Sequence, residues 1–245
     1  MKLGDLISTR ALVAGCVLAV AIFVFGQRRV SVEPVAEFRD VIDLTHPVSS
    51  QHTSQFAALK TAPLATRIEA PANYASSLWT VGQIPPARLV APLVVLDVRT
   101  GVKSNPDYQV SMADLIQWEK ENGPIPMGAI VMARSGWESK WKSAQTYGNA
   151  DKRGAMHFPS YSPDAAKFLT EGRNVIGLGI DTLSVAPAAS KNSAVYQYTL
   201  SHSVYQLDNV ANLDRAPARG AIAMIAPDKL ENGLSAPVRI LALVR

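Results

Sequence analysis

The sequence predicts a single mixed α/β domain preceded by one N-terminal hydrophobic helix. An uncharged apolar run at residues 11–26 predicts the helix. From Val41 to Val244, short apolar and β-branched runs of the buried-strand type alternate with helical segments, which predicts the α/β domain. No internal repeat or low-complexity linker divides that region, and its length suits one domain. The expected boundaries are residues 1–30 for the leader and tether, and 31–245 for the domain.

The leader has the features of a membrane anchor or signal segment. Lys2 and Arg10 precede its apolar run and Gln27-Arg28-Arg29 follows it. The run is short for a bilayer span, which needs about 20 apolar residues, but it lies near the lower limit. We therefore expect a single-pass protein of the bacterial inner membrane, with its globular domain in the periplasm.

Two processed forms of the leader are alternatives. Ala19-Val20-Ala21 has the small-residue pattern of a signal-peptide cleavage site, and Val13-Ala14-Gly15-Cys16 resembles a lipoprotein box. Cleavage at either place would leave a strongly apolar new terminus, so an uncleaved anchor is favoured.

Charge and cysteine content exclude several function classes. The net charge is +4, and no basic run is interleaved with aromatic residues, so nucleic-acid binding is not expected. Cys16, in the leader, is the only cysteine. The domain therefore has no disulfide, no thiolate metal site and no cysteine nucleophile.

The first half of the domain is predicted to contain two strands and, between them, a segment that suits a third. Val41–Leu44 is a short strand that ends at Thr45-His46-Pro47, and 49–54 is a loop by composition. Pro63–Tyr74 follows, with alternating positions that suit a strand. Leu93–Val98 is a buried strand.

The second half of the domain is predicted to contain two helices and four strands. Ser111–Asn122 is a helix that Ser111 and Asp114 cap, and a second helix starts at Ser162-Pro163-Asp164 and ends near Gly172. The expected strands are residues 129–133, 175–180, 221–226 and 238–244, and the second of these carries Asp181 at its end.

Several short motifs, in order along the chain, resemble the cyclase family of metal-dependent hydrolases, which includes bacterial kynurenine formamidase and isatin hydrolase. They are Asp43-Leu44-Thr45-His46-Pro47, Ile84-Pro85-Pro86, Ser135-Gly136-Trp137, His157-Phe158-Pro159, Gly179-Ile180-Asp181-Thr182-Leu183-Ser184, Asp208-Asn209-Val210-Ala211-Asn212-Leu213-Asp214 and Pro237-Val238-Arg239. The resemblance implies the family's single α/β domain and an oligomeric assembly.

The family's metal-binding signature is altered in this sequence. The signature His-x-Gly-Thr-His-x-Asp-x-Pro-x-His, laid over residues 63–73, keeps Thr66 and Pro71. The resemblance implies three metal-ligand positions and one acid/base position, which are here Pro63, Arg67, Glu69 and, for the acid/base, Asn73. Later family positions for a histidine, a glutamate and an aspartate are Tyr196, Asp208 and Ala186.

These substitutions predict that the family's Zn or Mn ion is absent. A catalytic zinc site needs about three imidazole or carboxylate ligands. Proline has no ligating side chain and arginine stays protonated, so of the three altered positions only Glu69 could still bind a metal. Asn73 cannot exchange protons near neutral pH, so general-base catalysis at that position is also lost.

We expect an ion pair in place of the metal. On a strand, positions 67 and 69 face the same way, so Arg67 and Glu69 would lie side by side. Paired charges tolerate burial better than isolated ones. We hypothesise that Arg67 with Glu69, and also Asp208, forms a structural link where the metal once lay.

The other candidate residues have structural interpretations as well as functional ones. Asp181, at a strand end, and His157 are candidate catalytic groups, with loop hydrogen bonding as the alternative. Trp137 is a candidate binding residue or a core aromatic. His46 is interpreted as a structural residue of its turn. Ser135 and Ser184 lack a Gly-x-Ser-x-Gly elbow, which argues against a serine hydrolase.

The sequence therefore supports a membrane-anchored pseudoenzyme that acts as a binding or accessory subunit of a larger membrane complex or a homo-oligomer. The alternative is a hydrolase of cyclic amide, lactone or N-formyl substrates with a rebuilt site. Its candidate groups would be Asp181, Glu69, Asp208, Tyr196 and His157. A third possibility is a small-molecule binder with Arg67 as an anion anchor.

Overall fold

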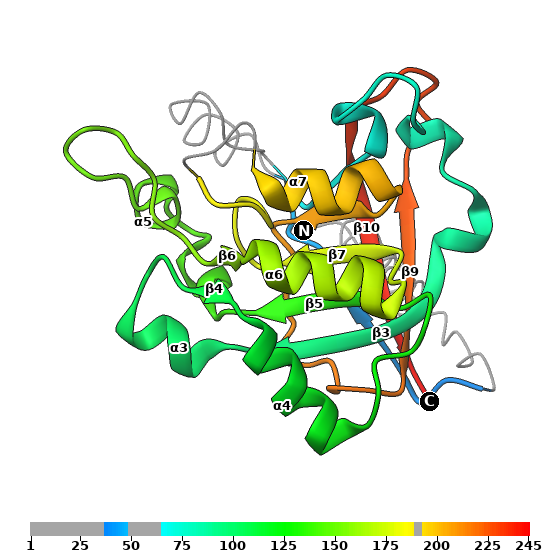
Figure 1. Cartoon of the computed structure of the whole chain (residues 1–245), viewed down its shortest axis with the longest axis horizontal. Helices are drawn as coiled ribbons and strands as arrows, with labels where there is room; N and C mark the ends of the chain where they lie inside the picture. The colour runs from blue at the N-terminus through cyan, green and yellow to red at the C-terminus, as the bar shows by residue number, and fades with distance from the viewer. Residues whose placement is uncertain (1–36, 49–64, 189–192) are drawn as a thin grey trace, which may run out of the picture. The chain divides into compact units, whose positions relative to one another are not determined.

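The computed structural model describes residues 37–48, 65–188 and 193–245 (Figure 1). The predicted N-terminal hydrophobic segment, the loop at residues 49–54 and Pro63 lie outside the described residues. Within the described ranges, every helix is too short or too polar to cross a bilayer.

The main sheet closes on itself. Its strands are β1 (Asp40–Asp43), β2 (Arg67–Glu69), β3 (Val90–Asp97), β5 (Ile130–Arg134), β7 (Gly177–Ile180), β8 (Tyr205–Asp208), β9 (Ala221–Pro227) and β10 (Ser235–Val244). The order is β1-β10-β2-β8-β7-β5-β3-β9, and β9 also pairs with β10, which closes a barrel. Strands β3, β5, β7 and β8 are parallel, and β2, β9 and β10 complete the barrel with antiparallel pairs.

Helices α4 (Met112–Asn122), α6 (Pro163–Lys167) with its continuation η5 (Phe168–Gly172), and α7 (Ala194–Thr199) cover the outside of the parallel strands. Two shorter helices, α3 (Arg99–Ser104) and α5 (Ala144–Gly148), lie in the connections that follow β3 and β5. Short 3-10 turns are η1 (Pro71–Asn73), η2 (Val81–Gln83), η3 (Pro86–Arg88), η4 (Trp137–Lys140) and η6 (Leu200–His202). Strands β4 (Gln109–Val110) and β6 (Ser160–Tyr161) form a small second sheet. Figure 1 shows α4, α6 and α7 along one face of the central strands.

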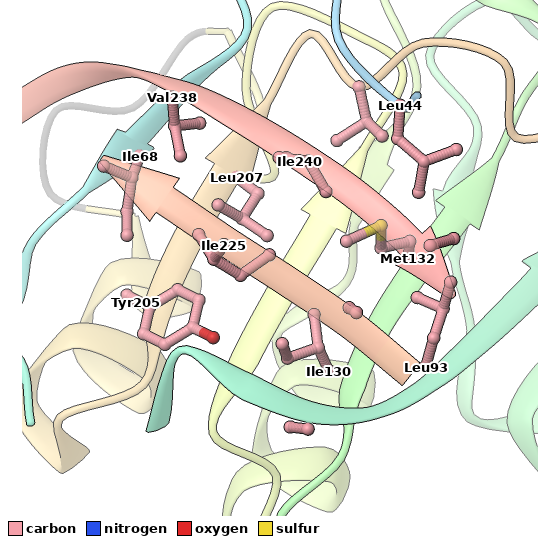
Figure 2. Close-up of a cluster of buried hydrophobic side chains, with 14 of the residues drawn as sticks. Leu44, Ile68, Leu93, Ile130, Met132, Tyr205, Leu207, Ile225, Val238 and Ile240 are labelled. Atoms are coloured by element: carbon pink, nitrogen blue, oxygen red, sulfur yellow. The ribbon is translucent and has the colours of Figure 1, made fainter. Parts of the chain in front are cut away.

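The barrel has an apolar interior. Alternate residues of its strands point inward, and Figure 2 shows Ile68, Leu93, Met132, Leu207 and Ile240 in this cluster. A second apolar cluster lies between the outer face of the strands and helices α4, α6 and α7. Successive residues of a strand therefore alternate between the barrel interior and its outer face. The side chains of β2 and β8 that do not point inward lie on that outer face.

Most of the predicted elements are present. Helix α4 has the expected capping box, in which Ser111 Oγ accepts from Asp114 N at 3.2 Å and Asp114 Oδ2 accepts from Ser111 N at 2.7 Å. The predicted strand through residues 63–73 is shorter than expected, because β2 ends at Glu69 and Pro71 begins the turn η1. The sequence analysis did not predict α7 or β8.

Candidate functional site

Four polar side chains lie together on the outer face of β2 and β8. In the antiparallel register Arg67 is opposite Asp208 and Glu69 is opposite Gln206. Ile68 and Leu207, the residues between them, point into the barrel (Figure 2). Because side chains alternate along a strand, Arg67, Glu69, Gln206 and Asp208 share the opposite face. We call these four residues the β2–β8 polar cluster.

An ion pair joins the charged members of this cluster. The Arg67 Nη2 group donates a hydrogen bond to Glu69 Oε1, so the predicted pairing of Arg67 with Glu69 is confirmed. Arg67 Nε lies 3.9 Å from Asp208 Oδ2. The Arg67 side chain is 20% exposed, against 9% for Glu69 and 1% for Asp208. The guanidinium is therefore the part of the cluster that is nearest to solvent.

Asp208 is held in an environment that disfavours its charged form. Burial, followed by the negative charge of Glu69, raises the pKa of Asp208 well above its usual range, and Arg67 opposes this shift. Asp208 Oδ1 also accepts a hydrogen bond from Val185 N at 3.1 Å. Asp208 therefore keeps its proton to a higher pH than an exposed aspartate does.

This environment predicts a pH dependence of stability. The native state binds a proton at Asp208 more tightly than the unfolded chain, so the free energy of unfolding should rise as pH falls through the raised pKa towards about 4, the unfolded value. Urea unfolding across that range, for wild type and Asp208→Asn, measures the contribution. The rise should be smaller in the variant, and an unchanged profile would contradict the assignment.

Tyr196, on α7, lies close to the cluster. Burial, followed by the charges of Glu69 and Asp208, raises its pKa, so its phenol stays protonated and able to donate. Its hydroxyl lies 3.3 Å from Ser184 Oγ. Helix α7 thus brings a neutral hydroxyl to the same place as the two carboxyl groups.

Three buried atoms of the cluster have no hydrogen-bond partner among the described residues: Arg67 Nε, Glu69 Oε2 and Gln206 Oε1. The sequence analysis missed Gln206, whose amide nitrogen donates to Thr199 Oγ1 at 2.6 Å. Gln206 lies two residues before Asp208, so on a strand both side chains share one face, and this spacing could have identified Gln206. Buried polar atoms are nearly always paired, so these atoms mark a place where a ligand or water can bind.

The side chains of the cluster do not fit a divalent cation. In the described ranges, no group of three His, Cys, Asp or Glu side chains could hold a metal ion. The Arg67 guanidinium lies between the carboxylates, and a dication about 4 Å from it would be repelled by about 8 kcal/mol at an effective dielectric near 20. The absence of a bound Zn or Mn ion stays a prediction.

The remaining predicted site residues lie away from the cluster or form hydrogen bonds within the fold. Asn73 is exposed on η1. The ring nitrogen Nδ1 of His157 lies 2.8 Å from Asp107 Oδ2, in a part-exposed loop. Trp137 is buried, and its indole nitrogen donates to Tyr147 O at 2.8 Å.

Asp181, at the end of β7, accepts hydrogen bonds from the backbone of the turn that follows β5. Its carboxylate accepts backbone N–H groups of Ser135 at 2.9 Å, Gly136 at 2.7 Å and Trp137 at 3.1 Å. These bonds use both oxygens of a fully buried side chain. The arrangement matches the structural interpretation of Asp181 as a carboxylate that satisfies loop amides.

His46 is buried in the same region. Its ring stacks on that of Trp141, with centroids 4.0 Å apart, and its backbone N–H donates to Thr66 Oγ1 at 2.9 Å. Thr66 Oγ1 in turn donates to Asn209 O at 2.6 Å. These contacts fix the turn after β1 to the start of β2 and the end of β8, beside the polar cluster.

Comparison with known proteins identifies relatives that carry this fold. Isatin hydrolase of Roseibium aggregatum is 35% identical over 162 residues, which cover 64% of this chain and 60% of that protein. Kynurenine formamidase of Polaromonas naphthalenivorans is 37% identical over 82 residues, which cover 34% of this chain and 36% of that protein. The chain thus matches less than two thirds of the length of either protein.

Solved structures agree with this relationship over most of the chain. Isatin hydrolase A from Labrenzia aggregata, bound to benzyl benzoate, matches with a TM-score of 0.71 and 27% identity, covering 84% of this chain and 93% of that one. Isatin hydrolase A from Ralstonia solanacearum matches with a TM-score of 0.71 and 30% identity, covering 84% and 92%.

A family model named Cyclase matches residues 42–187, from β1 to the loop before α7. This region contains most of the motifs on which the resemblance rested, and the solved relatives share the closed α/β barrel around it. By sequence and by fold, the chain belongs to the cyclase family.

Proposed function

We propose that the protein hydrolyses the amide bond of a cyclic amide or an N-formyl amide at the β2–β8 polar cluster, without a metal ion. The observation that carries this proposal is the meeting of a guanidinium, a carboxylate and a carboxyl group of raised pKa at one place. The relatives support the substrate class, because they are named isatin hydrolase and kynurenine formamidase.

Each group of the cluster has a chemical role in this reaction. Arg67 Nε–H, which has no hydrogen-bond partner in the described part of the chain, would donate to the substrate carbonyl oxygen and stabilise the negative charge that forms on it. Glu69 Oε2, which likewise has no partner there, would accept a proton from the attacking water as the water oxygen bonds to the carbonyl carbon.

Asp208 would complete the reaction as the general acid. When the C–N bond breaks, the protonated Asp208 would give its proton to the departing nitrogen. The proton taken up by Glu69 then passes to Asp208, which restores the starting protonation state of both carboxyl groups. One water is consumed, and a carboxylic acid and an amine are formed, so atoms and protons balance.

Turnover of isatin and of an N-formyl arylamine by the purified full-length chain tests the proposal. We expect hydrolysis of at least one substrate to persist after treatment with a chelator. Asp228→Asn, at an exposed carboxylate just after β9, is the matched control and should retain the wild-type rate. Absence of turnover for both substrates would contradict the proposal.

A non-catalytic binding or accessory role is the second candidate. It is favoured by the closed Arg67–Glu69 ion pair and by the burial of Asp208, since both limit access of water and substrate to the carboxyl groups. In that case isatin or an anionic analogue would bind without turnover, with Arg67 as an anion anchor. Calorimetry on the same preparation distinguishes the two functions.

We also propose the membrane attachment that the leader predicts, with the domain in the periplasm and a membrane complex or homo-oligomer as its assembly. Support comes from the apolar run at residues 11–26 alone. Fractionation of cells that express the full chain should recover it in the inner membrane, and recovery of a shortened, freely soluble form would favour a cleaved signal.

A further inference from the structure

We propose that the Arg67 guanidinium is a covalently attached substitute for a divalent cation, which holds the oxygen donors of β2 and β8 together. Its removal should therefore convert the cluster into a metal-binding site. The inference concerns binding and stability, so it holds whether or not the protein is a catalyst.

The positive charge of Arg67 lies between the two strands. Arg67 pairs with Glu69 on its own strand and faces Asp208 across the strand pair, with Nε 3.9 Å from Asp208 Oδ2. The carboxyl groups of β2 and β8 would otherwise face each other on a buried surface. A cation between them is the simplest way to keep both in place.

Several oxygen donors surround the guanidinium. Within the described ranges, Glu69 Oε2 and Gln206 Oε1 are buried without hydrogen-bond partners, and Asp208 supplies a carboxyl group beside them. The cluster thus offers oxygen donors from three side chains on one face of the two strands. Carboxylate and amide oxygens are the ligands that Mn²⁺ and Mg²⁺ prefer, and an added imidazole would favour Zn²⁺.

The guanidinium itself prevents metal binding. It is a positively charged group and has no lone pair to donate to a metal ion. While Arg67 is present, a metal ion would have to displace it from Glu69. Arg67 therefore occupies the position from which it both links the strands and excludes a cation.

Titration with Mn²⁺ and Zn²⁺ tests the inference on the full-length wild type and on Arg67→Ala and Arg67→His. Arg173→Ala is the matched control, because Arg173 forms an ion pair with Glu119 at 2.7 Å elsewhere in the fold. Wild type and Arg173→Ala should not bind either ion stoichiometrically. Arg67→His should bind one ion at least about 100-fold more tightly than wild type, as expected when imidazole and carboxylate ligands converge.

Thermal unfolding of the same proteins provides a second readout. Arg67→Ala and Arg67→His should melt at lower temperature than wild type, and Mn²⁺ or Zn²⁺ should recover part of the loss in these variants alone. If a variant folds only when metal is present, that result also supports the inference. Stoichiometric metal binding by wild type, or no gain in affinity in either Arg67 variant, would overturn it.

Discussion

Replacement of Arg67 by Met should lower the free energy of unfolding at pH 7 by about 3 kcal/mol, because the buried Glu69 side chain loses its ion-pair partner. The figure is kept at the lower end of the range for buried ion pairs, since the Arg67 side chain is 20% exposed. Urea denaturation followed by circular dichroism measures the change. Met keeps most of the side-chain volume, so the loss reports on charge rather than on packing.

Arg173→Met is the control for this measurement. Arg173 Nε donates to Glu119 Oε1 at 2.7 Å, but its side chain is 32% exposed, so its removal should cost less than about 1 kcal/mol. Equal losses in the two variants would show that the Arg67 ion pair has no special structural role.

Replacement of Asp208 by Asn should reduce kcat/KM for amide hydrolysis by about 100-fold to 1,000-fold, as expected when a general acid is lost. The side chain keeps its size, and an amide oxygen can still accept from Val185 N. Stability should not fall at neutral pH, since the variant no longer has a buried carboxyl group to ionise. Steady-state kinetics and urea denaturation on one preparation separate the two effects.

The pH profile distinguishes catalysis from a merely structural role of Asp208. In wild type the rate should fall as pH rises through the raised pKa of Asp208, because the acid loses its proton. That limb should be absent in the residual activity of Asp208→Asn. An unchanged rate in the variant would exclude Asp208 as the acid and leave a binding role for the cluster.

Much of the fold was predictable from local patterns in the sequence. The buried strands β3, β5 and β7 are continuous apolar runs, and α4 has a capping box at its first turn. These signals depend only on neighbouring residues. The short motifs that resemble the cyclase family supplied the order of the elements, which local patterns could not.

The elements that were missed depend on tertiary contacts. Strand β8 has only four residues, so its alternation of inward-facing Tyr205 and Leu207 with polar Gln206 and Asp208 is too brief to predict a strand by itself. Helix α7 is also short, and three of its residues belong to or contact the outer apolar cluster. Both need their neighbours to form, since isolated short helices are unstable in water.

The candidate site was predicted only in part for the same reason. Arg67 and Glu69 are two residues apart, so their pairing follows from strand alternation, and it is confirmed. Asn73 is not part of the cluster, because Pro71 starts a 3-10 turn and ends the strand whose alternate residues share one face. Gln206 lies opposite Glu69 because of the register between β2 and β8, which the sequence of either strand alone does not specify.

The most direct test of the proposed metal-free site is the rate of isatin hydrolysis by full-length protein that has been freed of metal with a chelator. We predict that wild type retains its rate of isatin hydrolysis after this treatment, and that the rate of Asp208→Asn stays below the wild-type rate. Loss of the wild-type rate on chelation, with recovery on addition of Mn²⁺ or Zn²⁺, would contradict the account, because a metal ion and not Arg67 would then supply the positive charge.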